Sequence, residues 1–206
     1  MSIITLSADT LTATPGVGQI ELGPQFYAGT PNGLERGVIP CEQFYSLQTA
    51  VTGANATGAQ RILGVGVTLS AGVIYEFEIL SFLNKSAGTT SHTIGISFGG
   101  TATITSIGYF GQQSSYLTAP ATTQNAVGNY ISNTSNTVIT GALTSAAVFL
   151  PLSIKGVVSV NAAGTFIPQY SLSAAPGGAY TTAVGSYMKI KPIGASGSNV
   201  NVGIWS

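Results

Sequence analysis

Few side chains in this sequence could carry out chemistry on a substrate. The chain of 206 residues has a single histidine, His92, a single aspartate, Asp9, and a single cysteine, Cys41. A Ser–His–Asp triad would have to use His92 and Asp9, which lie far apart in the chain, and a Cys–His pair would have to use Cys41 and His92. We expect instead that His92 is a turn residue leading into a strand, and that Cys41 is a buried, inert thiol.

Glu76 and Glu78 form a close pair of carboxylates. If 73–83 is a strand, side chains two residues apart point to the same face and stand about 7 Å apart. Paired carboxylates at such a separation can cleave glycosidic bonds. Two glutamates on the water-facing side of a strand explain the spacing equally well, and we expect that role.

Neither a metal site nor a phosphate-binding loop is expected. One histidine and one cysteine are too few ligands for a zinc site unless two well-placed carboxylates join them. The glycines do not form a phosphate-cradling Gly-x-x-x-x-Gly-Lys loop. We therefore predict no catalytic residue, no bound metal and no cofactor, and we expect the protein not to be an enzyme.

Charged residues are scarce and unevenly spread. Only 6% of the residues are Asp, Glu, Lys or Arg, and the formal net charge is zero, whereas about 25% of an average soluble domain is charged. Between Lys85 and Lys155 no residue is charged. The chain has no basic patch, so we expect no nucleic-acid partner. Copies of such a protein repel one another weakly, which favours a subunit packed against neighbours.

The apolar residues do not form a membrane span. Mean hydropathy is +0.38, yet no stretch approaches the roughly 18 apolar residues of a membrane helix. The first residues lack the basic segment and apolar run of a secretion signal. We expect a protein without a membrane span.

Short alternating runs predict strands throughout most of the chain. The 27 glycines and the many β-branched residues favour strands over helices. We predict an all-β fold, a jelly-roll-like β-sandwich of about ten short strands. Pro168 indicates an edge strand or a bulge in its run. The predicted strands are 42–47, 61–69, 73–83, 93–98, 102–110, 137–140, 147–150, 154–160, 166–172, 187–193 and 199–205.

The first forty residues differ from the rest. They contain turn residues and too few apolar side chains for a core of their own, so we predict an extended N-terminal arm over 1–40 and one sandwich domain over 41–206. An extended segment cannot satisfy its backbone hydrogen bonds alone, and strand addition or groove packing on a partner would satisfy them. We predict that six apolar anchors in the arm bind a partner: Ile20, Leu22, Phe26, Tyr27, Val38 and Ile39.

Several aromatic side chains could stack on sugars. The candidates are Tyr109, Phe110, Tyr116, Tyr130 and Trp205. In a β-sandwich most such residues belong to the core or to subunit contacts, and we expect these roles here.

Two stretches, taken together and in order, carry a resemblance to known proteins. The first runs from TPGVGQIEL at 14–22 through QFY at 25–27 to RGVIP at 36–40 and EQF at 42–44, and the second comprises GSYMKIKPIG at 185–194 and VGIWS at 202–206. This pattern resembles small virion proteins and fibre tips of tailed bacteriophages. In these proteins an extended segment precedes a trimeric jelly-roll domain of the tumour-necrosis-factor-like kind. The resemblance implies a homotrimer, a location in the virion and no enzymatic activity.

The resemblance leaves two places in the particle open. We expect a capsid decoration, or cement, protein that binds the major capsid protein or other virion proteins as a trimer, with the arm clamping neighbours. The alternative is a tail-fibre or tail-tip protein that recognises host surface glycans. Fibre proteins of this kind usually carry a tail-attachment region ahead of the domain. Because this chain begins its arm at Met1, we favour decoration.

Overall fold

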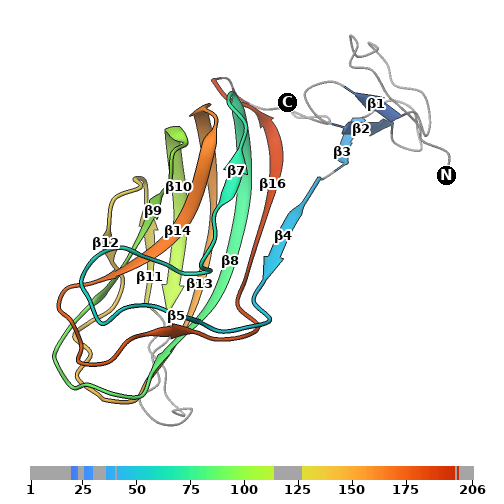
Figure 1. The fold of residues 1–206 in the computed structure, drawn as a ribbon. Coiled ribbons are helices and arrows are strands. Elements are labelled where there is room, and N and C mark those ends of the chain that lie inside the picture. The colour runs from blue at the N-terminus through green and yellow to red at the C-terminus, as the bar shows by residue number, and fades with distance from the viewer. Residues whose placement is uncertain are drawn as a thin grey trace.

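The protein is all-β and folds as two antiparallel sheets packed face to face (Figure 1). The structure is a computed structural model that describes residues 20–22, 26–29, 36–39, 41–113, 127–197 and 199. None of these residues belongs to a helix. The predicted all-β sandwich is therefore confirmed, whereas the predicted strand 199–205 lies almost wholly outside the described residues.

The larger sheet has eight strands and carries the longest ones. Its order is β11, β10, β13, β8, after which β16 and β4 lie beside the first part of β8, and β15 and β5 lie beside its end. All neighbouring strands are antiparallel. The strands are β4 (Gln43–Ser46), β5 (Val51–Thr52), β8 (Val73–Lys85), β10 (Thr103–Gln113), β11 (Val127–Ile131), β13 (Val148–Ala162), β15 (Thr181–Thr182) and β16 (Tyr187–Ala195).

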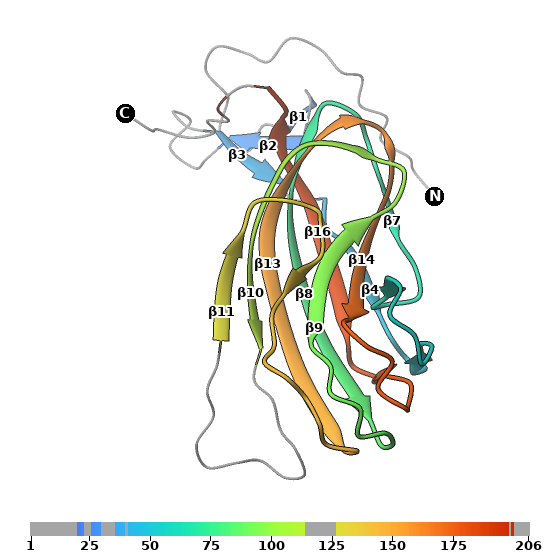
Figure 2. The same ribbon diagram turned by 90° about the vertical axis from the view of Figure 1, so that its left-hand side faces the viewer.

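The smaller sheet covers the inner face of the larger one (Figure 2). Its order is β12, β9, β14, β6, and β7 also pairs with β14. The strands are β6 (Gln60–Arg61), β7 (Val67–Leu69), β9 (Ile94–Gly99), β12 (Thr137–Val138) and β14 (Gly164–Leu172).

Two predicted strands, 147–150 and 154–160, form one strand of 15 residues, β13. Pro151 does not break it. Its partner Phe82 directs its own backbone N–H and carbonyl to Ser186 and Ala183, away from β13. The missing N–H of Pro151 therefore faces the β10 side, and the last pair with β10 is Leu152 with Gln113. The proline removes no bond from the ladder that the structure describes.

The predicted strand 61–69 is split into β6 and β7, and the reason lies in β14. β14 pairs with β9 on one side and with β6 and β7 on the other, so it is not the edge strand that Pro168 suggested. The Pro168 carbonyl accepts a bond from Ile62 N–H on the other side, where the partner strand is interrupted. The interruption matches the position at which a proline has no N–H to donate, and Gly64, with φ of 73°, turns the chain there.

An aromatic cluster joins the two sheets at the centre of the core. Phe77 and Tyr109 from the large sheet pack against Phe98 and Phe166 from the small one, with ring centroids 5.0 to 5.6 Å apart between the sheets, and Phe98 stacks on Phe166 at 4.8 Å. Gly156 on β13 lies between Phe77 and Tyr109 in register. A Cβ at Gly156 would stand 2.5 Å from the Gly108 carbonyl oxygen and 2.8 Å from the Phe77 ring. The glycine therefore makes room for the two rings.

The arm residues that the structure describes form a separate three-stranded antiparallel sheet (Figure 1). Its strands are β1 (Ile20–Leu22), β2 (Phe26–Gly29) and β3 (Arg36–Ile39), and β4 begins soon after, at Gln43. Backbone register puts Leu22, Phe26 and Ile39 opposite one another, and Tyr27 opposite Val38. Ile20 is exposed. The side chains of the other five predicted anchors lie outside the described residues, so partner binding by the arm stays a prediction.

We predict that Gly156→Ala destabilises the fold. The added methyl group has no free space, so strands or rings must shift, at a cost of about 1–3 kcal/mol in the free energy of unfolding. Gly111→Ala on β10 is the matched control, because a Cβ there meets nothing within 4 Å. Urea unfolding measures both variants. Equal stability of the two would contradict the packing described for Gly156.

Candidate functional site: the outer face of the large sheet

One row of side chains crosses the outer face of the large sheet. In an antiparallel sheet, residues directly opposite each other point to the same side, so their side chains are neighbours. Backbone register links one residue from each of six adjacent strands in this way. We call these residues the central row; in strand order they are Tyr130, Phe110, Lys155, Glu78, Lys189 and Phe44.

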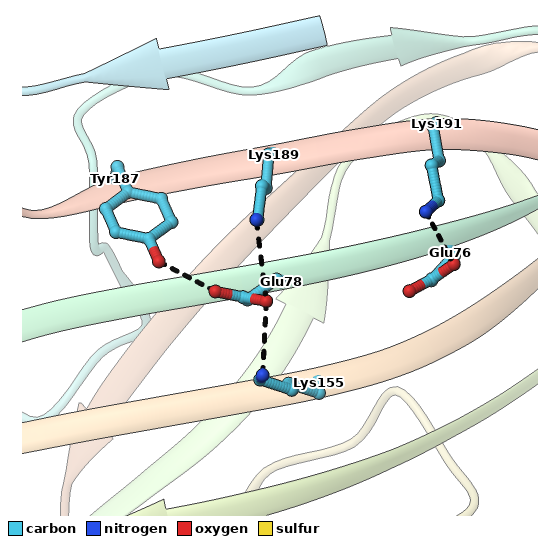
Figure 3. A network of polar contacts seen from close by, with 6 residues as sticks. All are labelled: Glu76, Glu78, Lys155, Tyr187, Lys189 and Lys191. Atoms are coloured by element: carbon cyan, nitrogen blue, oxygen red, sulfur yellow. Dashed lines mark hydrogen bonds and ion pairs between the residues drawn. The ribbon is translucent and has the colours of Figure 1, made fainter. Parts of the chain in front are cut away.

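Glu78 is the centre of a polar network on this face (Figure 3). One carboxylate oxygen accepts a hydrogen bond of 2.7 Å from the Tyr187 hydroxyl. The other lies 3.2 Å from Lys155 Nζ and 3.7 Å from Lys189 Nζ. Beside this group, Glu76 pairs with Lys191 at 3.1 Å. Strands β13, β8 and β16 therefore carry alternating positive, negative and positive side chains.

The network holds Glu78 in its anionic form. The hydrogen bond from Tyr187 is the largest cause of the lowered pKa of Glu78; partial burial opposes it, and Lys155 and Lys189 lower the pKa further. The same hydrogen bond raises the pKa of Tyr187. A carboxylate stabilised in this way is a poor proton donor at neutral pH. The pair Glu76 and Glu78 lies, as expected, on one outward face, with its charges satisfied by lysines.

Most of the charge of the sandwich is gathered here. The described part of the domain contains eight charged residues, and five of them form the two ion-paired groups of Figure 3. Glu42 lines a shallow depression on this face together with the two glutamates and the β16 lysines of the network. Only Arg61 and Lys85 lie elsewhere. The remaining described surface of the sandwich therefore carries almost no charge.

Exposed aromatic rings stand at both ends of the central row. The side chain of Tyr130 on β11 is 75% exposed and that of Phe44 on β4 is 62% exposed. A Cβ placed on Gly108 would lie 3.4 Å from the Tyr130 hydroxyl and 3.6 Å from its ring, so the Tyr130 ring lies over this glycine. Phe44 packs against Tyr187, with centroids 5.6 Å apart. Large exposed rings at defined positions are typical of binding surfaces.

An apolar groove opens beside β4, between the edges of the two sheets. It is lined by residues of β4, by Leu63 and residues 65–68, and by Met188 and Ile190 of β16. Its volume is about 370 Å³. The groove contains no charged side chain, so it is suited to apolar contacts with a protein and not to binding a charged small molecule.

His92 is buried and structural. It was predicted as a turn residue; instead it forms an isolated bridge with Leu143 and lies inside the protein. Its Nδ1 lies 2.7 Å from the Thr90 carbonyl oxygen and its Nε2 lies 2.8 Å from the Tyr180 hydroxyl. A carbonyl only accepts, so Nδ1 carries a proton, and in the neutral ring Nε2 accepts a hydrogen bond from the Tyr180 hydroxyl. Both ring nitrogens are occupied, and Asp9 lies outside the described residues.

Ser97 lies in a Gly-x-Ser-x-Gly pattern, Gly95 to Gly99, which is found around the nucleophile of many hydrolases. In those enzymes the serine stands on a sharp turn between a strand and a helix. Here the five residues lie within β9, and Ser97 is buried opposite Gln169. The pattern is therefore part of a regular strand, and the turn that would present a nucleophile is not formed.

Two further residues differ from expectation. Cys41 is exposed, so its prediction as a buried thiol was wrong. It lies two residues before β4, an edge strand of the large sheet. Lys85 is buried and was not singled out, although it continues the inward-facing positions of β8 after Leu83. Its Nζ lies 2.5 to 3.3 Å from the carbonyl oxygens of Ala87, Gly88, Ser145 and Ala146, and burial lowers its pKa. It joins the loops at the ends of β8 and β13.

The aromatic residues considered for sugar stacking differ in their exposure to solvent. Tyr109 is buried in the core, whereas Phe110 and Tyr130 are exposed next to each other in the central row. Burial raises the pKa of Tyr109 to about 12. Tyr116 and Trp205 lie outside the described residues.

Comparisons with protein-family models, with curated proteins and with solved structures find no match to this chain. Among the residues that the structure describes, no three His, Cys, Asp or Glu side chains lie close enough to hold a metal ion together. Within the same residues, no helix has the length and hydropathy to cross a membrane.

We predict that Glu78 makes the free energy of unfolding depend on pH in the acid range. Because its pKa is lowered in the folded state, its stabilising effect is present above the ordinary glutamate pKa of about 4.3 and is lost as the pH falls through the lower, folded-state value. Glu78→Gln should lower the free energy of unfolding at pH 7 by about 1 kcal/mol and flatten its decline below pH 4.3. Denaturant unfolding between pH 7 and pH 3 measures both effects.

The control is Glu42→Gln, which removes the same charge from an exposed position outside the ion pairs of Figure 3. It should leave the pH profile close to that of the unmodified protein. If Glu42→Gln flattens the acid decline and Glu78→Gln does not, the network is not the source of the pH dependence.

Proposed function

We propose that this chain is a structural protein of a tailed-bacteriophage particle and not an enzyme. In this proposal it decorates the capsid as a homotrimer of jelly-roll-like domains, and its N-terminal arm binds the shell. The observation that carries the proposal is the surface of the sandwich, which has almost no charge away from one ion-paired network and exposes aromatic rings at the margins of the large sheet. Such a surface is poorly suited to a free monomer and well suited to a subunit surrounded by protein.

The charge-free stretch between Lys85 and Lys155 supports self-association. It supplies β9, β10, β11, β12 and the first part of β13, and so includes one edge strand of each sheet. Among its described residues, four large apolar side chains are exposed: Phe110, Tyr130, Val138 and Phe149. Burial of these side chains between subunits would remove apolar surface from water without desolvating a charge. The attribution to a phage particle comes from the sequence resemblance at the two ends of the chain.

A second candidate is a tail-tip protein that binds host surface glycans. It is favoured by Tyr130, whose ring lies over Gly108 with most of its surface open to solvent. An exposed aromatic ring on the surface of a sheet can stack on the apolar face of a sugar. The same ring would serve equally well as a protein contact, so the position in the particle decides between the two functions.

Quantification of this protein in purified virions tests the proposal. A decoration protein covers the shell, so we expect hundreds of copies per particle when gel band intensities are compared with that of the major capsid protein. A tail-tip protein would be present in tens of copies or fewer. Absence from purified virions would contradict both functions.

We further predict that removal of residues 1–40 leaves a folded domain that binds capsids much more weakly. The sandwich core uses side chains from Leu47 onward, so truncation should not unfold it, whereas the predicted anchors of the arm are lost. Co-sedimentation with undecorated capsids measures the binding, and the full chain is the control. Equal binding by both proteins would show that the arm is not the attachment device.

A further inference from the structure

Two edge strands of the large sheet, β11 and β4, lie at the ends of the central row and are unguarded. Within the described residues β11 pairs only with β10, and β4 pairs only with β16. The two strands lie on opposite sides of the sandwich (Figure 2). Edge strands usually carry a charge, a proline or a bulge that prevents pairing with another chain. The residues of β4, QFYS, and of β11, VGNYI, include neither a charged residue nor a proline.

The direction of the strands allows one copy to continue the sheet of another. The path β11, β10, β13, β8, β16, β4 contains six strands, and each neighbouring pair is antiparallel. Because the direction reverses at each step and the number of strands is even, the first strand, β11, and the last strand, β4, run in opposite directions. When β11 of one copy is placed beside β4 of the next, with both sheets facing the same way, the new pair is antiparallel as well.

The side chains at the two edges also match. Within the described part of the chain, Tyr130 and Phe44 have the largest exposed fractions of the large apolar side chains, and they end the same central row. If the row continues across the contact, the Phe44 ring of one copy meets the Tyr130 ring of the next. Each ring then covers part of the exposed surface of the other, as aromatic cross-strand pairs do within a sheet.

Electrostatics favours the same contact. Across it the row would read Lys189, Phe44, Tyr130, Phe110, Lys155, so the nearest charged members are separated by three aromatic side chains. Each of these lysines already pairs with Glu78 of its own copy. No charge in the row would lose its partner or meet a like charge at the contact.

We infer that copies of this chain associate head to tail, with the β11 edge of one copy pairing with the β4 edge of the next. This inference rests on the proposed self-association and names its surfaces; it is independent of capsid binding. Pairing of two β11 edges about a two-fold axis would also be antiparallel, but it leaves both β4 edges open. The head-to-tail contact uses the β11 edge and the β4 edge of every copy, and such contacts can close into a ring, as a homotrimer requires.

A charge exchange tests the contact. Phe44→Lys and Tyr130→Glu each place a charge at one edge without a partner, so each variant should fall from three chains to one in light scattering at micromolar concentration. The two substitutions in the same chain should restore the trimer, because the introduced lysine of one copy faces the introduced glutamate of the next. Pairing of identical edges would instead bring like charges together in the double variant.

Val184→Lys and Val184→Glu are the matched controls. Val184 is 54% exposed and lies between β15 and β16, outside both edge strands and outside the central row. These variants should remain trimeric. Circular dichroism and thermal unfolding establish that all variants are folded, and any variant that is unfolded is judged from the cross-linking experiment instead.

Cross-linking uses Cys41→Ser chains that carry Phe44→Cys, Tyr130→Cys or both, treated with a flexible thiol-specific cross-linker. The double variant should give covalent dimers and trimers, whereas each single variant should give none. A dimer formed by either single variant, or no cross-link in the double variant, overturns the inference. Charged single variants that remain trimeric also overturn the inferred edge contact, but they do not contradict the proposal of capsid decoration. If the protein passes these tests but does not bind capsids, the decoration proposal is contradicted and the edge contact stands.

Discussion

The strict alternation of β8 connects the core of this protein to its outer face. On one side of the strand Tyr75, Phe77 and Ile79 are buried, and Phe77 joins the aromatic cluster between the sheets. On the other side Glu76 and Glu78 accept the lysines of the neighbouring strands. A shift of register by one residue would place both carboxylates in the apolar core and the rings in water, so the two faces fix each other.

Scarcity of charge makes the position of each charged residue informative. Exposed ion pairs contribute little to stability, about 0.2–1 kcal/mol each, so stability alone does not account for the gathering of five of eight charges at one place. The pairs lie at the middle of the sheet, on β13, β8 and β16, where neighbouring strands can supply partners. The edges of the sheet are left without charge, and this distribution is the opposite of what protects a monomer from association.

Much of the fold could be predicted from the sequence, because period-2 alternation is a local signal. The outward position of Glu76 and Glu78 followed directly from it. The boundaries of the strands were harder to predict from the sequence. Pro151 and Pro168 suggest breaks or edges. The missing N–H of Pro168 faces the interruption between β6 and β7, and that of Pro151 lies on the β10 side, where the last described pair is Leu152 with Gln113. Only the sheet order shows this. The burial of His92 and the carbonyl cage around Lys85 depend on loops distant in sequence, so no local pattern indicates them.

The candidate site could not be predicted for a related reason. Tyr130, Phe110, Lys155, Glu78, Lys189 and Phe44 are spread over most of the chain, and only the pairing of six strands brings them into one row. Within that row the order of the side chains has a physical consequence. Charges that must keep their partners occupy the interior strands, where the protein itself provides those partners, and the rings that gain by leaving water occupy the two edges. A contact made at the edges therefore covers apolar surface while every ion pair remains within its own subunit, which is the combination that permits association at low energetic cost.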